Sequence, residues 1–210
     1  MSQTIREMRR AIIAMLLAVL ISSPLSAGPN VDLSGAEGHP RERFPLAVHL
    51  TAIGEPALDA AAERALRDWN SLFAEALGAR AFTGASDPVT AQVIVRFERS
   101  DAARLMGETE VGADERGVIA LPVRIVVIAP KAQGQTAADV VFYQVLAHEL
   151  GHALGLAHTR EPRSLMCCVR GSIDFNDPAS RDAYIDARRH PDIRSVRAQL
   201  VQHYARWWTR

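Results

Sequence analysis

Residues 148–158 read HELGHALGLAH, and this segment holds three histidines at fixed intervals. His148 and His152 are four residues apart, so on a helix their side chains lie one turn apart on the same face. Two imidazoles at that spacing can bind one tetrahedral zinc ion. Gly155 is expected to end the helix in a left-handed conformation, which lets the chain return and bring in His158 as a third ligand. Three protein ligands leave the fourth position for water, which is typical of a catalytic zinc site.

Glu149 follows the first histidine and is rotated away from the two ligands around the same helix. Its carboxylate can then reach a water on the metal without binding the metal itself. We therefore predict that Glu149 is the catalytic general base.

The pattern H-E-x-x-H-x-x-G-x-x-H resembles the zinc signature of the metzincin metalloproteases. Ser164-Leu165-Met166 follows His158 after a short loop and is similar to the methionine turn of that group. The run with Met166 eight residues after the third histidine looks most like the matrixin branch. The resemblance is sharp over residues 136–166, loose over 44–130 and absent after Cys168.

The resemblance implies an α+β fold: a twisted mixed sheet with three main helices, in which the active-site helix is followed by the methionine turn at Met166. It also implies that residues 118–121 form the sheet edge to which an extended substrate adds as a strand. The expected function is that of a zinc-dependent endopeptidase, a monomer holding one catalytic Zn²⁺. It hydrolyses peptide bonds with a zinc-bound water and Glu149 as general base. Structural calcium is possible for this family, but the sequence does not indicate where it would bind.

Two alternatives remain open at this point. The chain can be a catalytically idle zinc-binding module that uses the same scaffold for recognition, or a zinc hydrolase that acts on cell-wall peptide. The first is disfavoured because only catalysis needs Glu149. The second depends on specificity side chains that the sequence does not place.

The first 28 residues have the three parts of a secretory signal peptide. Arginines at positions 6, 9 and 10 precede an apolar run over 11–21, and small residues follow near Ala27. Eleven apolar residues are too few to span a bilayer, which needs about 20. We predict a signal peptide over 1–28, an irregular arm over 29–43 and a catalytic domain over 44–210, in a protein exported to the periplasm or the extracellular space. An uncleaved anchor and a twin-arginine signal are the alternatives for this segment.

Composition and charge narrow the range of partners. The 210 residues are 48% hydrophobic and 23% charged, as in ordinary globular proteins. The basic and acidic side chains balance at 24 each, so no excess charge favours nucleic acid or, after signal cleavage, a membrane. A protein or peptide substrate is the expected partner.

Hydrophobic periodicity predicts the remaining elements. Strands are expected over 46–50, 91–97, 118–121 and 123–128. Helices are expected over 57–77, over 136–155 with a capping box at Thr136, from Pro178 and over 192–207. Trp207 and Trp208 should pack on the domain. The histidines outside the motif are expected at the surface or at helix ends; these are His39, His49, His190 and His203.

Cys167 and Cys168 are adjacent and are the only two cysteines. Across a trans peptide their Cα atoms lie about 3.8 Å apart, below the usual disulfide span of about 4.4–6.8 Å. They can be two small apolar side chains under the metal site, a vicinal disulfide or an intermolecular bridge. Cys168 also stands where astacins and serralysins carry a tyrosine that reaches the zinc, so a thiolate ligand is a further alternative. Our hypothesis is that neither thiol binds zinc, because three imidazoles and water complete a tetrahedron.

Overall fold

A computed structural model describes residues 33–99, 106–130 and 136–209. Its elements form a five-stranded mixed sheet and four α-helices, which is an α+β fold. The strands are β1 (Leu46–Leu50), β2 (Phe82–Gly84), β3 (Val93–Glu98), β4 (Gly107–Glu110) and β5 (Val123–Ile128). The helices are α2 (Pro56–Leu77), α3 (Ala138–Ala153), α4 (Pro178–Arg189) and α5 (Arg197–Trp207).

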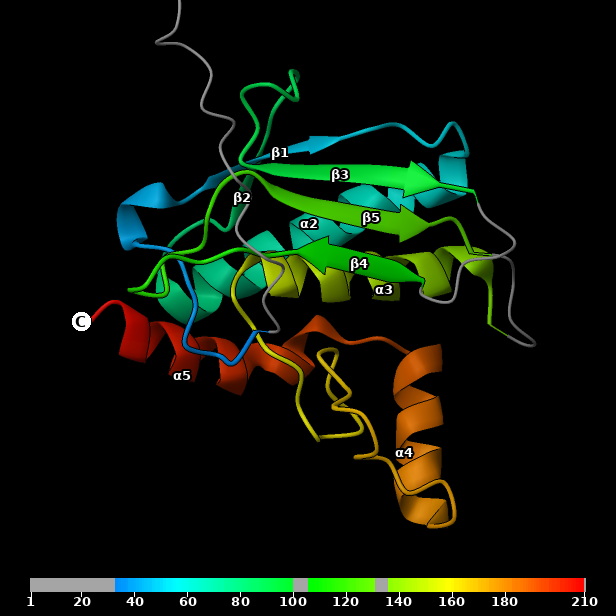
Figure 1. Cartoon of the computed structure of the whole chain (residues 1–210). Helices are drawn as coiled ribbons and strands as arrows, with labels where there is room; N and C mark the ends of the chain where they lie inside the picture. The colour runs from blue at the N-terminus through cyan, green and yellow to red at the C-terminus, as the bar shows by residue number, and fades with distance from the viewer. Residues whose placement is uncertain (1–32, 100–105, 131–135, 210) are drawn as a thin grey trace, which may run out of the picture.

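The sheet has the strand order β2-β1-β3-β5-β4, and all neighbours are parallel except the antiparallel pair β4 and β5. Helices α2 and α3 cover one face of the sheet, whereas α4 and α5 lie beyond α3 (Figure 1). Five inner side chains of β3 and β5 are β-branched and fully buried, as suits strands of a parallel sheet covered by helices: Val93, Val95, Val123, Ile125 and Val127. The predicted fold class is confirmed, with α4 as a fourth helix beside the three main ones.

The predicted helix over 57–77 is confirmed as α2, with Pro56 at its first turn. Its buried residues recur at three- and four-residue intervals and include Trp69, whose indole Nε1 donates to the carbonyl of Ala147 at 2.9 Å. Gly78 ends the helix in the left-handed conformation with φ of 66°. Helix α2 therefore fixes the middle of α3, which carries the histidine motif.

The active-site helix α3 is shorter than predicted. It begins after Ala137, which makes no side-chain cap, so the predicted capping box at Thr136 is wrong. Thr136 lies one residue too early for its hydroxyl to cap the first turn. At the other end, Gly155 has the predicted positive φ of 85°. A methyl group at Gly155 would lie 2.5 Å from the carbonyl oxygen of Glu37, so glycine is also required for this close approach.

The prediction that residues 118–121 form the substrate-binding edge of the sheet is wrong. Val118 and Ile119 make only isolated bridges to Gly38 and Ala113, because their backbone hydrogen bonds go to the N-terminal arm and to a neighbouring loop. The edge strand beside α3 is β4. Its sequence, GETE, lacks alternating apolar residues, so periodicity gave no sign of it.

The N-terminal arm and the C-terminal helix pack together at the end of α3. Trp207 donates from Nε1 to the Ala36 carbonyl, and Trp208 donates to the His39 carbonyl, which confirms that both tryptophans pack on the domain. His39 and His203 are buried and neither is a helix cap, so their predicted placement at the surface or at a helix end is wrong. Their burial comes from contact between the arm, the end of α3 and α5, and the arm has no periodic pattern in the sequence that would predict it.

His49 and His190 differ from the two buried histidines. His190 is the C-cap residue of α4 and pairs with Asp186, as expected for a helix end. His49 is half-buried in β1 and bonds to the Ala85 carbonyl, so it lies neither on the open surface nor at a helix end. In the described part of the chain, every helix is too short or too polar to cross a bilayer. The predicted signal peptide over 1–28 lies outside the described residues.

Buried His39 predicts a loss of stability in acid. Its Nε2 donates to the Ala153 carbonyl at 2.9 Å, and Arg43 lies beside its Nδ1. Burial, with the charges of Arg43 and His203, lowers the pKa of His39 from 6.5 to about 4. Between about pH 4 and pH 6.5, the unfolded chain therefore binds more protons than the folded chain. Stability that is fully present above pH 6.5 is lost as the pH falls toward 4.

Urea unfolding of metal-free protein at about pH 6.5 and pH 5 measures this effect. The full slope is about 1.36 kcal/mol per pH unit, and the unfolded His39 is half protonated at pH 6.5. The native chain should therefore lose about 1.5 kcal/mol more over that interval than His39→Gln, which keeps a donor but does not titrate. His190→Gln is the matched control, since that side chain is exposed. Equal losses in the native chain and His39→Gln would contradict the prediction.

Candidate active site

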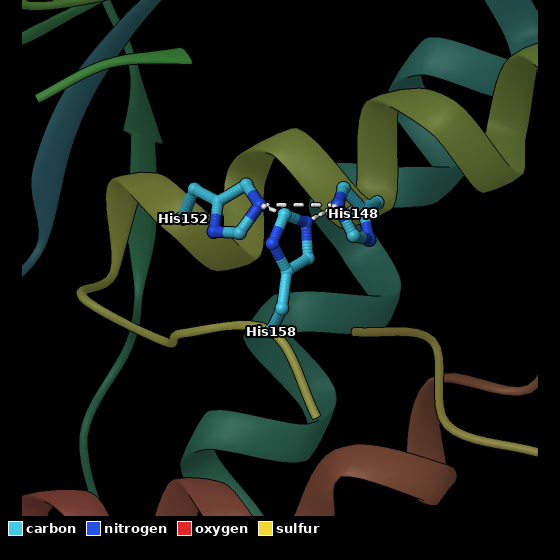
Figure 2. Close-up of side chains that lie close together, drawn as sticks. All are labelled: His148, His152 and His158. Carbon is cyan, nitrogen blue, oxygen red and sulfur yellow. Dashed lines mark hydrogen bonds between the residues drawn. The ribbon is translucent and has the colours of Figure 1, made fainter. Parts of the chain in front are cut away.

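The structure brings the three histidines of the motif together in one cluster. His148 and His152 lie on successive turns of α3, and His158 returns from the loop after Gly155 (Figure 2). The three Nε2 atoms are 3.0, 3.1 and 3.2 Å from one another. No other group of three or more candidate ligands occurs among the described residues.

Backbone carbonyls orient the two helical imidazoles. Nδ1 of His148 donates to the carbonyl of Leu165, and Nδ1 of His152 donates to the carbonyl of Leu156, each at 2.8 Å. With the proton on Nδ1, the lone pair of each ring lies on Nε2 and points into the cluster. Burial, assisted by the neighbouring histidines, lowers the pKa of His148 to about 3 and that of His152 to about 4, so both rings are neutral near pH 7.

This donor set fits a zinc ion. Convergent lone pairs repel one another unless a cation lies between them. In a tetrahedral site with Zn–N bonds of about 2.0–2.1 Å, neighbouring ligand nitrogens are about 3.3 Å apart. The observed Nε2 separations are close to that value, and neutral imidazole is a preferred zinc ligand. The histidine cluster can therefore hold Zn²⁺ with little movement.

The turn at residues 164–167 supports the cluster from below α3. Met166 is fully buried, and a methyl group on Gly151 would overlap its sulfur, so the glycine allows the turn to pack against the helix. The backbone N–H of Thr159 donates to the Met166 carbonyl at 2.9 Å, which ties the His158 loop to this turn. The preceding residue, Leu165, supplies the carbonyl that orients His148.

Met166 fills space under the helix, and this predicts a mild effect of a volume-conserving change. Met166→Leu should lower the free energy of unfolding by at most about 1.5 kcal/mol and leave the zinc content unchanged. Denaturant unfolding and metal analysis of the purified variant measure the two quantities. Complete loss of zinc would mean that Met166 binds the metal or that the turn is placed wrongly.

Glu149 is buried beneath the edge strand. Its side chain is 6% exposed, and its Oε2 accepts a hydrogen bond of 2.6 Å from the hydroxyl of Thr109 on β4. A methyl group on Gly107 would lie 2.7 Å from Oε1, so glycine lets β4 approach the carboxylate closely. Burial raises the pKa of Glu149 to about 7; the Thr109 hydroxyl opposes the shift and Glu108 adds to it. A cation held by the histidines would lower this pKa again.

An open hollow of about 790 Å³ lies over the histidines and Glu149. Strand β4 forms one wall with Gly107, Glu108 and Thr109. Helix α4 and the segment after Met166 form another wall, which includes Arg188 and Val169. Thr109 and Arg188 could not be predicted as lining residues from the sequence, because neither belongs to a motif.

Cys167 and Cys168 are joined in a vicinal disulfide. Of the alternatives left open by the sequence, the structure contains this one. The peptide bond between the two residues is cis. Neither cysteine belongs to the candidate ligand cluster.

The geometry agrees with a comparison against protein families. Residues 103–177 match the family model of the matrixins. This matrixin-like segment includes β4, β5, all of α3, the three histidines and the methionine turn. No curated protein sequence matches the chain. The segment indicates a zinc metallopeptidase, and its histidine cluster can bind the metal that such enzymes use.

Proposed function

We propose that this protein is a zinc-dependent endopeptidase. The observation that carries the proposal is the convergence of three imidazole Nε2 atoms beside a buried carboxylate at an open hollow. Each part has a role in peptide hydrolysis, and the matrixin-like segment contains all of them.

His148, His152 and His158 are the proposed metal ligands, and Glu149 is the proposed general base. When bound, Zn²⁺ supplies Lewis-acid chemistry that polarises the scissile carbonyl and acidifies water. Glu149 accepts a proton from the attacking water and returns it to the leaving amine. Thr109 donates to Oε2 of Glu149 and so fixes which carboxylate oxygen is free to take the proton.

The exposed edge of β4 is the proposed docking site for an extended peptide. It borders the hollow and lies directly against α3. A peptide that pairs with β4 by main-chain hydrogen bonds would run past Glu149 and the histidines. This replaces residues 118–121 as the substrate-binding edge.

Burial of Glu149 also favours catalysis over a recognition module. A module that only binds zinc needs the three imidazoles, and a buried carboxylate close to them adds a desolvation cost without a function.

We further propose that the catalytic domain spans 44–210, preceded by the arm over 29–43, and that the signal peptide over 1–28 directs export.

Incubation of the purified chain with an unbiased peptide library, with and without a chelator, tests the proposed function. We expect cleavage at internal peptide bonds that the chelator abolishes and added Zn²⁺ restores. Cell-wall peptides belong in the same experiment, because cleavage of these alone would identify a narrower hydrolase. Absence of any chelator-sensitive cleavage would contradict the proposal.

A further inference from the structure

The walls of the hollow differ in charge. The β4 wall carries Glu108, whereas the opposite wall carries Arg170 and Arg188. Helix α4, which bears Arg188, starts at Pro178, immediately after the matrixin-like segment ends at residue 177. The cationic wall is therefore formed in part by an element outside the family match.

Arg188 is held in a defined position by neutral groups. Its Nη2 donates to the Cys167 carbonyl at 2.9 Å, and its guanidinium lies 4.7 Å from the ring centroid of Tyr184. The amide of Gln144, turned so that its oxygen faces the guanidinium, accepts from Nε at 3.0 Å and from Nη1 at 2.7 Å. These contacts link Arg188 both to α3 and to the turn that orients His148.

The charge of Arg188 is not neutralised within the described part of the chain. The ion pairs among those residues join other side chains, and none includes Arg188. A guanidinium has five N–H donors, and the three contacts above engage three of them. Two donors and a full positive charge therefore remain for a ligand in the hollow.

We infer that Arg188 makes this site select a substrate with a carboxylate close to the scissile bond, either an acidic side chain or, in a short peptide, a C-terminus a few residues beyond an internal bond. A guanidinium positioned by three partners is suited to a charge-assisted, two-point hydrogen bond with a carboxylate. Glu108 on the opposite wall disfavours the reverse orientation of such a substrate. The inference rests on the proposed peptidase function and assigns its specificity.

Matched peptides test the inference on the native chain. One pair differs only by Glu or Gln beside the cleaved bond, and a second pair differs only by a free or an amidated C-terminus. We expect kcat/KM to favour the carboxylate member of at least one pair by about tenfold or more. In Arg188→Gln this preference should disappear. Arg189→Gln is the matched control, since Arg189 is exposed on the same helix and does not line the hollow.

Peptide binding gives a readout independent of turnover. Fluorescence anisotropy with zinc-loaded Glu149→Gln should show the same preference in Kd, and the additional change Arg188→Gln should remove it. Zinc content and unfolding midpoints establish that the variants are folded. Equal kcat/KM and Kd within both pairs, or a preference that survives Arg188→Gln, would overturn the inference. Cleavage without a carboxylate preference would leave the peptidase proposal intact. A carboxylate preference in binding without any cleavage would refute only the peptidase chemistry.

Discussion

Replacing Glu149 by glutamine is expected to lower peptide hydrolysis by at least about 100-fold while zinc stays bound. Glutamine keeps the size and most of the shape of the side chain, and its amide oxygen can still accept from Thr109. It cannot take a proton from water, however, so the loss should appear in kcat. Metal analysis and kinetics on the best library peptide measure the two effects separately.

Glu63→Gln is a suitable control for that experiment, because Glu63 is an exposed acidic residue on α2. Its activity should equal that of the native chain. Near-normal hydrolysis by Glu149→Gln would exclude Glu149 as the general base. Absence of hydrolysis in both the native chain and the variant, with zinc bound to each, would instead favour the recognition module.

Removing the imidazole of His158 should weaken zinc binding by more than about 100-fold. Even the loss of a partner that only orients a metal ligand costs about 10- to 100-fold in affinity, and loss of a direct ligand costs more. His158 is the ligand furthest along the chain and the most exposed of the three. Its removal leaves the helical pair and their backbone contacts in place. Competition with a zinc-sensitive dye measures the change in Kd for His158→Ala.

His190→Ala is the matched control for metal binding, since His190 is exposed and pairs with Asp186 far from the cluster along the chain. We expect its zinc affinity to be unchanged. One tightly held zinc in His158→Ala would mean that another group completes the site, and the three-ligand proposal would then be wrong.

The local parts of this protein could be predicted because their physical causes are local. Histidines four residues apart share a helix face whatever surrounds the helix, and Gly155 ends that helix by its own conformational freedom. Apolar periodicity likewise predicted α2 and three of the five strands. The candidate metal ligands are therefore evident from an eleven-residue segment.

The predictions from the sequence were wrong where a contact between distant segments decides the local structure. His39 has no pattern that predicts burial; it is buried because it meets the end of α3, 114 residues later. Residues 118–121 have strand propensity, but the arm and the loop at residues 112–114 take up their hydrogen bonds instead of the sheet. The sequence left the state of the two adjacent cysteines open, and the structure joins them in a disulfide.

The sequence by itself determined the composition of the site: three imidazoles, one carboxylate and the turn methionine, at spacings that suit one metal ion. Only the tertiary structure decided the environment of these groups. Strand β4, which has no apolar pattern, places Thr109 and Gly107 against Glu149. Helix α4, which follows the histidine motif in the chain, places Arg188 in the wall of the hollow. Metal-ligand spacing is a property of one helix and its following loop. The polarity, burial and charge of the hollow instead depend on packing between segments separated by 21 to 40 residues.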